Sequence, residues 1–312
     1  TAFAVLHANA IPVFADIDPY TWTIDPKAIA ACITPRTKAI IPVSIYGLAP
    51  DMDGIIELAA RHNLFVLEDD AECFLGYYKG RIVGSIGHAS SFSFQSTKHM
   101  TSGEGGMITT DDEGLAERIR RFSSLGYAAV GAAAGKGKIT RETIQDPVYE
   151  RHASIGFNYR LPELCAAVAL AQLERLRELV DLRIAVGRLY EEALDGCSWL
   201  TPQATPDGYI HSYWSYVARI APEVDFTWYD FRDKYKEMGG DGIYAAWQIN
   251  YLEPAFRQTS FHPEQTQDFA RGLCPVAEAV QPRLLQFKTN YFDPTVAAQK
   301  AEALAKTIAY FG

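Results

Sequence analysis

Apolar and polar residues along the first part of the chain follow two different periods. Helical spacing of apolar residues predicts helices over residues 25–33, with Asp25 as the N-cap, and over 51–62. Short apolar runs between turn signals predict three buried strands, at residues 11–17, 38–45 and 64–67. Strands that alternate with helices in this order are typical of a parallel sheet with crossover helices.

The pattern changes further along the chain. It predicts short strands and two more helices, at residues 89–94, 106–110, 113–122 and 293–310. Helical phase between residues 162 and 194, interrupted at Gly187, predicts one long helix of the kind that joins two domains. We therefore expect an α/β fold: a mixed, mostly parallel sheet with flanking helices over residues 1–196, and a smaller α+β domain over 197–312.

The composition is that of an ordinary globular protein, with 312 residues, 48% hydrophobic and 21% charged. A net charge of −9 and the lack of a dense Lys/Arg cluster argue against a nucleic-acid-binding protein. No apolar stretch is long enough to span a bilayer, and the histidines lack zinc-site spacing, so we expect no membrane partner and no metal. Five scattered cysteines are typical of reduced thiols in a cytoplasmic protein.

One lysine stands in an unusual context. Lys98 ends the polar segment 93–98, which leads into a glycine-rich loop at 101–106. Upstream, the apolar run 64–67 ends in carboxylates, and Asp69 is expected at the rim of the sheet, where ligands of α/β proteins bind. A lysine and an acid at the ends of neighbouring strands suit pyridoxal phosphate: the amine forms a Schiff base with the aldehyde, and the acid keeps the ring nitrogen protonated. A metal site or a helix cap stays an alternative for the acid.

Nearby residues fit the same chemistry. Ser93 would donate to a phosphate oxygen, and the small Ala71 would let a ring lie flat against the backbone. The segment 131–137 imitates a phosphate-binding P-loop, but it has one residue too few between its glycines and no strand before it. His99 is either a second catalytic group or a histidine that satisfies backbone groups. Four aromatic residues would either face a substrate or, more commonly, pack in the core: Tyr213, Trp214, Tyr244 and Trp247.

At these residues the chain resembles a known family, the pyridoxal-phosphate-dependent sugar aminotransferases of the DegT/DnrJ/EryC1/StrS type. The resemblance extends over essentially the whole chain and rests on these segments: 12–18, 24–26, 34–40, 46–52, 68–71, 93–106 and 156–161. It implies the aspartate-aminotransferase-like fold, fold type I of the pyridoxal phosphate enzymes. It also implies that a further N-terminal segment, with a phosphate-binding turn and a stacking aromatic, is missing here.

The resemblance implies a role for each candidate residue. Lys98 would form the Schiff base, Asp69 would pair with the ring nitrogen, Ala71 would pack on a ring face, and Ser93 would bind the phosphate. Glu72 stands where family members often have Gln or His, and would alter the hydrogen bond to the cofactor hydroxyl. Asn158 and Arg160 would reach the phosphate of the neighbouring subunit's cofactor, since the family forms homodimers with shared active sites.

The implied reaction is transfer of an amino group, commonly from glutamate, to a nucleotide-linked keto-sugar in surface-polysaccharide or secondary-metabolite biosynthesis. Two alternatives stay open. In related sugar dehydratases a histidine replaces the lysine, which Lys98 argues against but His99 keeps in view. A non-catalytic protein of the same fold is the other alternative, suggested by Glu72 and the expected missing segment.

Overall fold

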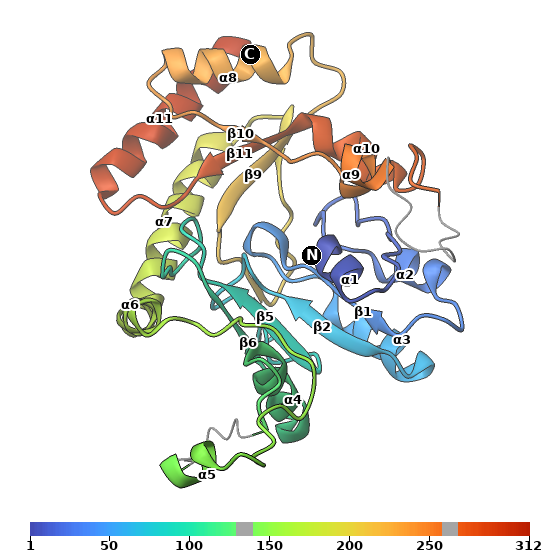
Figure 1. The fold of residues 1–312 in the computed structure, drawn as a ribbon. Coiled ribbons are helices and arrows are strands. Elements are labelled where there is room, and N and C mark those ends of the chain that lie inside the picture. Colours follow the sequence, from blue (N-terminus) through green and yellow to red (C-terminus); the bar gives the residue numbers. More distant parts are fainter. Residues whose placement is uncertain (129–139, 258–267) are drawn as a thin grey trace.

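The computed structural model describes residues 1–128, 140–257 and 268–312 (Figure 1). Its first sheet has the strand order β1-β2-β5-β6, with β1 and β2 parallel, β2 and β5 parallel, and β6 antiparallel to β5. The strands are β1 (Ala39–Ile40), β2 (Phe65–Asp69), β5 (Ala89–Ser93) and β6 (Gly106–Thr109). The expected mixed, mostly parallel sheet is therefore confirmed.

Helices pack on this sheet as the spacing of apolar residues predicts. The N-terminal half contains α1 (Ala2–His7), α2 (Pro26–Cys32), α3 (Met52–His62) and, beyond β6, α4 (Glu113–Ser123). Asp25 caps α2 by accepting from the backbone of Lys27, as predicted. In α3, Ile55 and Leu58 are buried in one cluster with Val66 of β2, so the helix covers the strand that leads to the acids.

A second sheet, in the upper half of Figure 1, is antiparallel throughout and has the order β10-β11-β9-β7. Its strands are β7 (Leu200–Pro202), β9 (Ser215–Ile220), β10 (Tyr244–Ala245) and β11 (Leu284–Lys288). The helices packed with it are α7 (Leu176–Leu194), α8 (Trp228–Glu237) and α11 (Pro294–Phe311), around an aromatic-rich core. The domain boundary after residue 196 stays a prediction; α7 contributes Val186, Tyr190 and Leu194 to this core.

A small third sheet joins the two parts of the chain. It has the order β4-β3-β8, with β3 (Tyr77–Tyr78), β4 (Arg81–Ile82) and β8 (Tyr209–Ile210). Because β8 pairs with β3, the segment that leads into β9 returns to the core of the first sheet, where Tyr78 and Tyr209 pack in one cluster with Val66. The remaining described helices are α5 (Arg141–Gln145), α6 (Glu163–Glu174), α9 (Pro254–Arg257), α10 (Pro275–Val280) and three single turns at Ile45–Gly47, Asn250–Leu252 and Gln281–Arg283.

Three sequence expectations are corrected. Residues 11–17 form no strand; a single bridge joins Ile17 to Ile24. The long helix expected over 162–194 is two helices, α6 and α7, separated at Arg175, whose backbone leaves the helical region. Gly187 does not interrupt α7. A Cβ at this glycine would meet the Tyr213 ring at 2.8 Å, so close packing, not a break, explains it. The P-loop-like segment 131–137 lies outside the described residues.

Candidate functional site

Three consecutive acids at the end of β2 are separated by the alternation of the strand. Glu68 and Asp70 are buried, whereas Asp69 between them is half-buried and lies on the opposite side. The Glu68 carboxylate accepts hydrogen bonds from three backbone N–H groups, those of Gly84, Ile86 and Gly87. Glu68 therefore holds the loop before β5, and only Asp69 of the three is left for a ligand.

Asp70 is fully buried between two hydroxyl groups. Ser44 Oγ lies 2.7 Å from Oδ1 and Ser90 Oγ lies 2.6 Å from Oδ2. Burial first, and then the charge of Glu68, raise the pKa of Asp70 to about 7, against the effect of the two hydroxyl bonds. Asp70 therefore titrates near neutral pH, although nothing joins it directly to the lysine.

Asp69 is the last residue of β2 and pairs in register with Ser91 of β5. Its Oδ1 accepts from the backbone N–H of Ala71 at 3.3 Å, and its Oδ2 accepts from the Thr1 hydroxyl at 2.5 Å. Ser93 ends the neighbouring strand β5, and its hydroxyl accepts from the backbone of Gln95 at 3.3 Å. The acid and the hydroxyl thus stand at the same edge of the sheet, as the sequence predicts.

Lys98 lies in the turn after β5, and its amine is paired with Glu72. The Nζ–Oε1 distance is 3.2 Å, and the two side chains are only 12% and 15% exposed. Nζ also lies 4.5 Å from the centroid of the Trp214 ring, a cation–π contact. The other carboxylate oxygen of Glu72 accepts from the backbone N–H of Tyr46. Glu72 therefore fixes where the amine lies.

Glu72 also connects the lysine to Asp69 electrostatically. Burial is the main cause that raises its pKa, the positive charge of Lys98 opposes the rise, and the negative charge of Asp69 adds to it. The structure thus places Lys98, Glu72 and Asp69 in one charged group, a partly enclosed amine beside a carboxylate at a strand end. This set of an amine, an acid and the Ser93 hydroxyl fits the groups of pyridoxal phosphate: an aldehyde, a ring nitrogen and a phosphate.

Asn158 and Arg160 are placed differently. Both are exposed, and Asn158 pairs with Ser124 at the end of α4. No hydrogen bond or ion pair in the described parts of the chain joins either side chain to Lys98 or Asp69. Within one chain the structure does not bring them into the lysine site, and their role at a neighbouring subunit's cofactor stays a prediction.

His99 is a packed, structural histidine. It is 4% exposed, its Nε2 lies 2.9 Å from the carbonyl oxygen of Ser212, and its ring contacts that of Phe74. Burial, followed by the nearby charge of Arg183, holds its pKa well below the ordinary value. This neutral, enclosed ring fits the interpretation of His99 as a histidine that satisfies backbone groups, and not as a second catalytic group.

The four aromatic candidates separate into three cases. Tyr213 is buried in the core of the second sheet, and Trp214 contacts the lysine. Tyr244 and Trp247 are 66% and 78% exposed and lie elsewhere.

Sequence reasoning also missed Arg183, a buried residue of α7 that bonds to the backbone of the lysine turn. An arginine in helical phase with apolar neighbours was the available signal.

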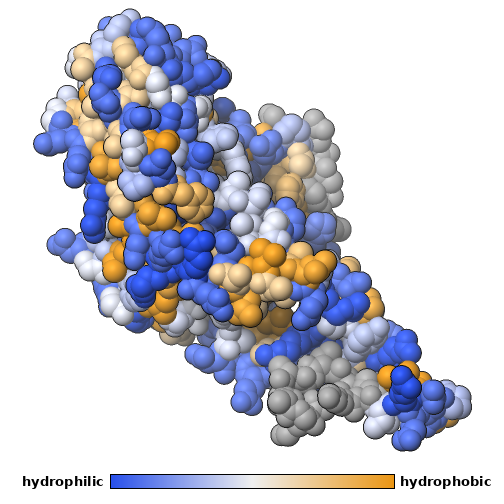
Figure 2. Space-filling model, turned by 90° about the vertical axis from the view of Figure 1, so that its left-hand side faces the viewer, coloured by the Kyte–Doolittle hydropathy of each residue, from blue (hydrophilic) through white to orange (hydrophobic). Residues whose placement is uncertain are grey.

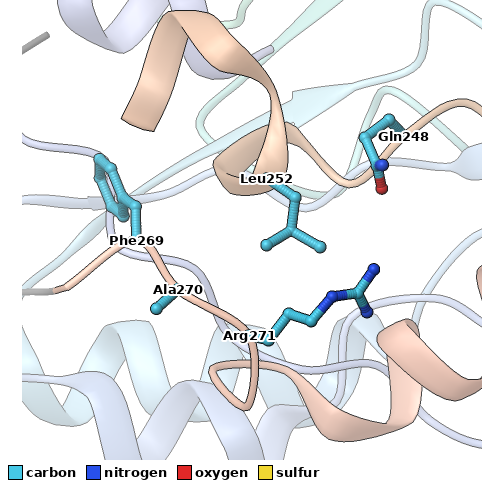
Figure 3. A pocket seen from close by; sticks show the side chains of 5 residues that line it. All are labelled: Gln248, Leu252, Phe269, Ala270 and Arg271. Carbon is cyan, nitrogen blue, oxygen red and sulfur yellow. The ribbon is translucent and has the colours of Figure 1, made fainter. Parts of the chain in front are cut away.

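Figure 3 shows a pocket of about 450 Å³ in the C-terminal part of the chain. It is lined by Gln248, Leu252, Phe269, Ala270 and Arg271. None of these is a predicted site residue, and the pocket presents one cation and no nucleophile.

Solved structures with this fold include the aminotransferase from Psychrobacter cryohalolentis, which superimposes with a TM-score of 0.84 at 29% identity over 99% of this chain and 78% of that one. 3-Amino-5-hydroxybenzoic acid synthase gives a TM-score of 0.82 at 27% identity, over 99% and 77%. The chain therefore shares its fold with these proteins.

The chain belongs to the DegT/DnrJ/EryC1/StrS aminotransferase family, whose family model matches residues 1–292. Aminotransferases of this family depend on pyridoxal phosphate. Curated relatives include the spore coat polysaccharide biosynthesis protein SpsC of Bacillus subtilis, 41% identical over 70% of this chain, and GDP-perosamine synthase of Caulobacter vibrioides, 39% identical over 73%. The matched parts cover 55% and 57% of those relatives, so this chain spans little more than half of their lengths.

Proposed function

We propose that this chain forms the lysine-bearing part of a cytoplasmic sugar aminotransferase, which moves an amino group from glutamate to a nucleotide-linked keto-sugar. The observation that carries the proposal is the enclosed Lys98 amine, held by Glu72 next to Asp69, in a member of this family. Relatives named GDP-perosamine synthase and UDP-N-acetyl-3-dehydro-α-D-glucosamine 3-aminotransferase support nucleotide sugars as the substrate class.

Each residue has a definite task in this proposal. Pyridoxal phosphate, when bound, supplies an aldehyde for the amine and a ring that withdraws electrons from the reacting carbon. Asp69 Oδ2, which accepts from a hydroxyl in this structure, would hold a proton at the ring nitrogen. Ser93 would donate to the phosphate, and Ala71 would leave space beside the ring. Lys98 Nζ would carry the proton between Cα of the amino donor and C4′ of the cofactor as general acid and base.

Glu72 is the hydrogen-bond acceptor and the counter-charge of the Lys98 amine. Its Oε1 accepts from Nζ while its Oε2 is fixed by the Tyr46 backbone, so the carboxylate cannot turn away without losing a bond. A glutamine here would still hydrogen-bond the amine but would carry no charge. We therefore assign Glu72 to orienting Lys98 and keeping a compensating charge within reach.

A homodimer with shared active sites is part of the proposal. Helix α6 has apolar residues on all sides, and four of them are at least half exposed: Leu164, Val168, Leu170 and Leu173. Figure 2 looks onto the side where α6 lies and shows apolar residues gathered across this face. An apolar helix surface of this kind is typical of an interface. A second subunit docked here would offer its own Asn158 and Arg160 to a phosphate.

The structure gives no support to the dehydratase alternative, because Lys98 is present and His99 is enclosed and bonded to the backbone. A non-catalytic protein is the remaining alternative. It is separated from the proposal by whether the protein takes up the cofactor and exchanges an amino group.

The proposal is tested by adding pyridoxal phosphate to the purified protein and then glutamate. We expect a yellow protein that bleaches with glutamate and forms 2-oxoglutarate. Lys98→Ala should abolish both changes, whereas Lys38→Ala, at an exposed lysine, should leave them intact. Absence of any cofactor-derived absorbance at saturating pyridoxal phosphate would overturn the proposal, as would full turnover by Lys98→Ala.

A further inference from the structure

Arg183 is a buried cation without a buried anion. It is 5% exposed, in the middle of α7, and none of the ion pairs in the described part of the chain involves it. Burial lowers its pKa to about 10, and no carboxylate acts against that change. A charge in this position is costly unless its hydrogen bonds are satisfied, so the acceptors around it are informative.

All the acceptors of Arg183 are neutral oxygens, and two of them belong to the lysine turn. Its Nη2 donates to the carbonyl oxygens of Thr97, at 3.2 Å, and Lys98, at 3.0 Å. Its Nη1 donates to the carbonyl oxygen of Trp214, at 2.8 Å, and to Thr289 Oγ1, at 3.1 Å. One planar guanidinium thus joins the catalytic turn to the segments before β9 and after β11.

The same network positions the aromatic ring beside the amine. The Trp214 indole N–H donates to the Thr97 carbonyl oxygen at 2.9 Å, and its ring faces Lys98 Nζ. The Thr289 hydroxyl donates to the carbonyl oxygen of Trp214 or of Tyr213. Arg183 therefore acts on Lys98 twice: through the backbone of the turn, and through the tryptophan that borders the amine.

We propose that Arg183, on α7, is a positioning residue for Lys98. Its planar set of N–H donors aligns the amine by holding the lysine turn and Trp214 in place. A lysine cannot reproduce this arrangement, because an ammonium is a point donor without the planar fork that reaches both pairs of oxygens. The inference rests on the proposed function, because alignment of the Lys98 amine matters for catalysis only if this amine is the nucleophile. It predicts that the placement of the amine depends on α7.

The test uses the protein without added cofactor. Brief treatment with acetic anhydride, followed by mass spectrometry, measures the acetylation of Lys98 relative to the exposed Lys27 at several pH values. In Arg183→Met and Arg183→Lys the freed turn should expose the amine and raise the Lys98/Lys27 ratio by about threefold or more. Arg188→Met, at an exposed arginine of the same helix, is the matched control and should leave the ratio unchanged.

A second variant covers the case in which Arg183→Met does not fold. Thr289→Val keeps the shape of the side chain and removes one acceptor, so it should change the ratio in the same direction and by less. A Lys98/Lys27 acetylation ratio within twofold of the parent in every folded Arg183 and Thr289 variant would overturn the inference. Arg183 would then only link these segments of the chain, without positioning the amine.

Cofactor titration separates the two proposals. If the parent protein takes up no pyridoxal phosphate, the proposed function fails, while the labelling result still decides the placement of Lys98. If the parent transaminates, we expect Arg183→Lys to lower kcat about tenfold or more with little change in the KM for glutamate, as loss of alignment requires. Unchanged kcat would count against the positioning role.

Discussion

Replacing the buried acid beside the site should change how stability depends on pH. Asp70→Asn imitates the protonated carboxyl between Ser44 and Ser90, with nearly the same shape. The folded-state pKa of Asp70 is about 7 and its ordinary value is 3.8. Because the folded value is the higher one, the stability that the group contributes is complete below about pH 4 and is lost as pH rises towards 7.

The magnitude follows from the two pKa values. Within this window the parent protein loses about 1.4 kcal/mol of unfolding free energy per pH unit through this group. Since Asp70 is already partly ionised at pH 7, the loss between pH 5 and pH 7 is about 2 kcal/mol. The asparagine variant does not titrate here, so its stability relative to the parent should rise by that amount.

Urea unfolding followed by circular dichroism at pH 5, 6 and 7 measures the difference. Asp111→Asn, at an exposed acid, is the control and should track the parent at every pH. Glu68 and Asp69, the other acids that act on Asp70, are unchanged in both variants. A constant difference between Asp70→Asn and the parent across this range would refute the reasoning, because it would mean that Asp70 stays ionised in the folded protein.

Three further outcomes are expected. Glu68→Ala should cost about 3 kcal/mol or more in urea unfolding, since three backbone N–H groups lose their acceptor, and an unchanged midpoint would contradict this. Gly187→Ala should cost about 1–3 kcal/mol because its Cβ would press on the Tyr213 ring, whereas Gly242→Ala, with open space around it, should not. If α6 forms the proposed dimer interface, Leu164→Glu should shift the protein from dimer to monomer in sedimentation; a dimer of parental strength would exclude α6 from the interface.

Much of the first sheet could be predicted from the sequence, because its signals are local. Caps and apolar spacing gave α2, α3 and α4 nearly to the residue. The strand that carries Asp69 was also predicted, although it extends to Asp69 itself. The expected strand at 38–45 shrinks to β1, with one further bridge at Val43, because Pro42 has no N–H to donate to a ladder.

The rest depended on contacts that are remote in sequence. Nothing local marks the break between α6 and α7, where the change of direction is set by packing. Gly187 resembled a helix breaker because its partner, Tyr213, is far along the chain. For the site, the residue types of Lys98 and Asp69 pointed to their chemistry. The pairing of Lys98 with Glu72 and the bonds of Arg183 depend on loops that only the fold brings together.

The alternation of acids at the end of β2 has a consequence for variation in this segment. Glu68 and Asp70 point to one side and Asp69 to the other, and parallel neighbours on both edges fix the strand. Deleting or inserting one residue within 65–68 would exchange the two sides, so that the half-buried carboxylate of Asp69 would turn inward and a buried one would turn outward. A substitution can therefore change one of these acids at a time, whereas an insertion or a deletion in the strand would displace all three in a single step.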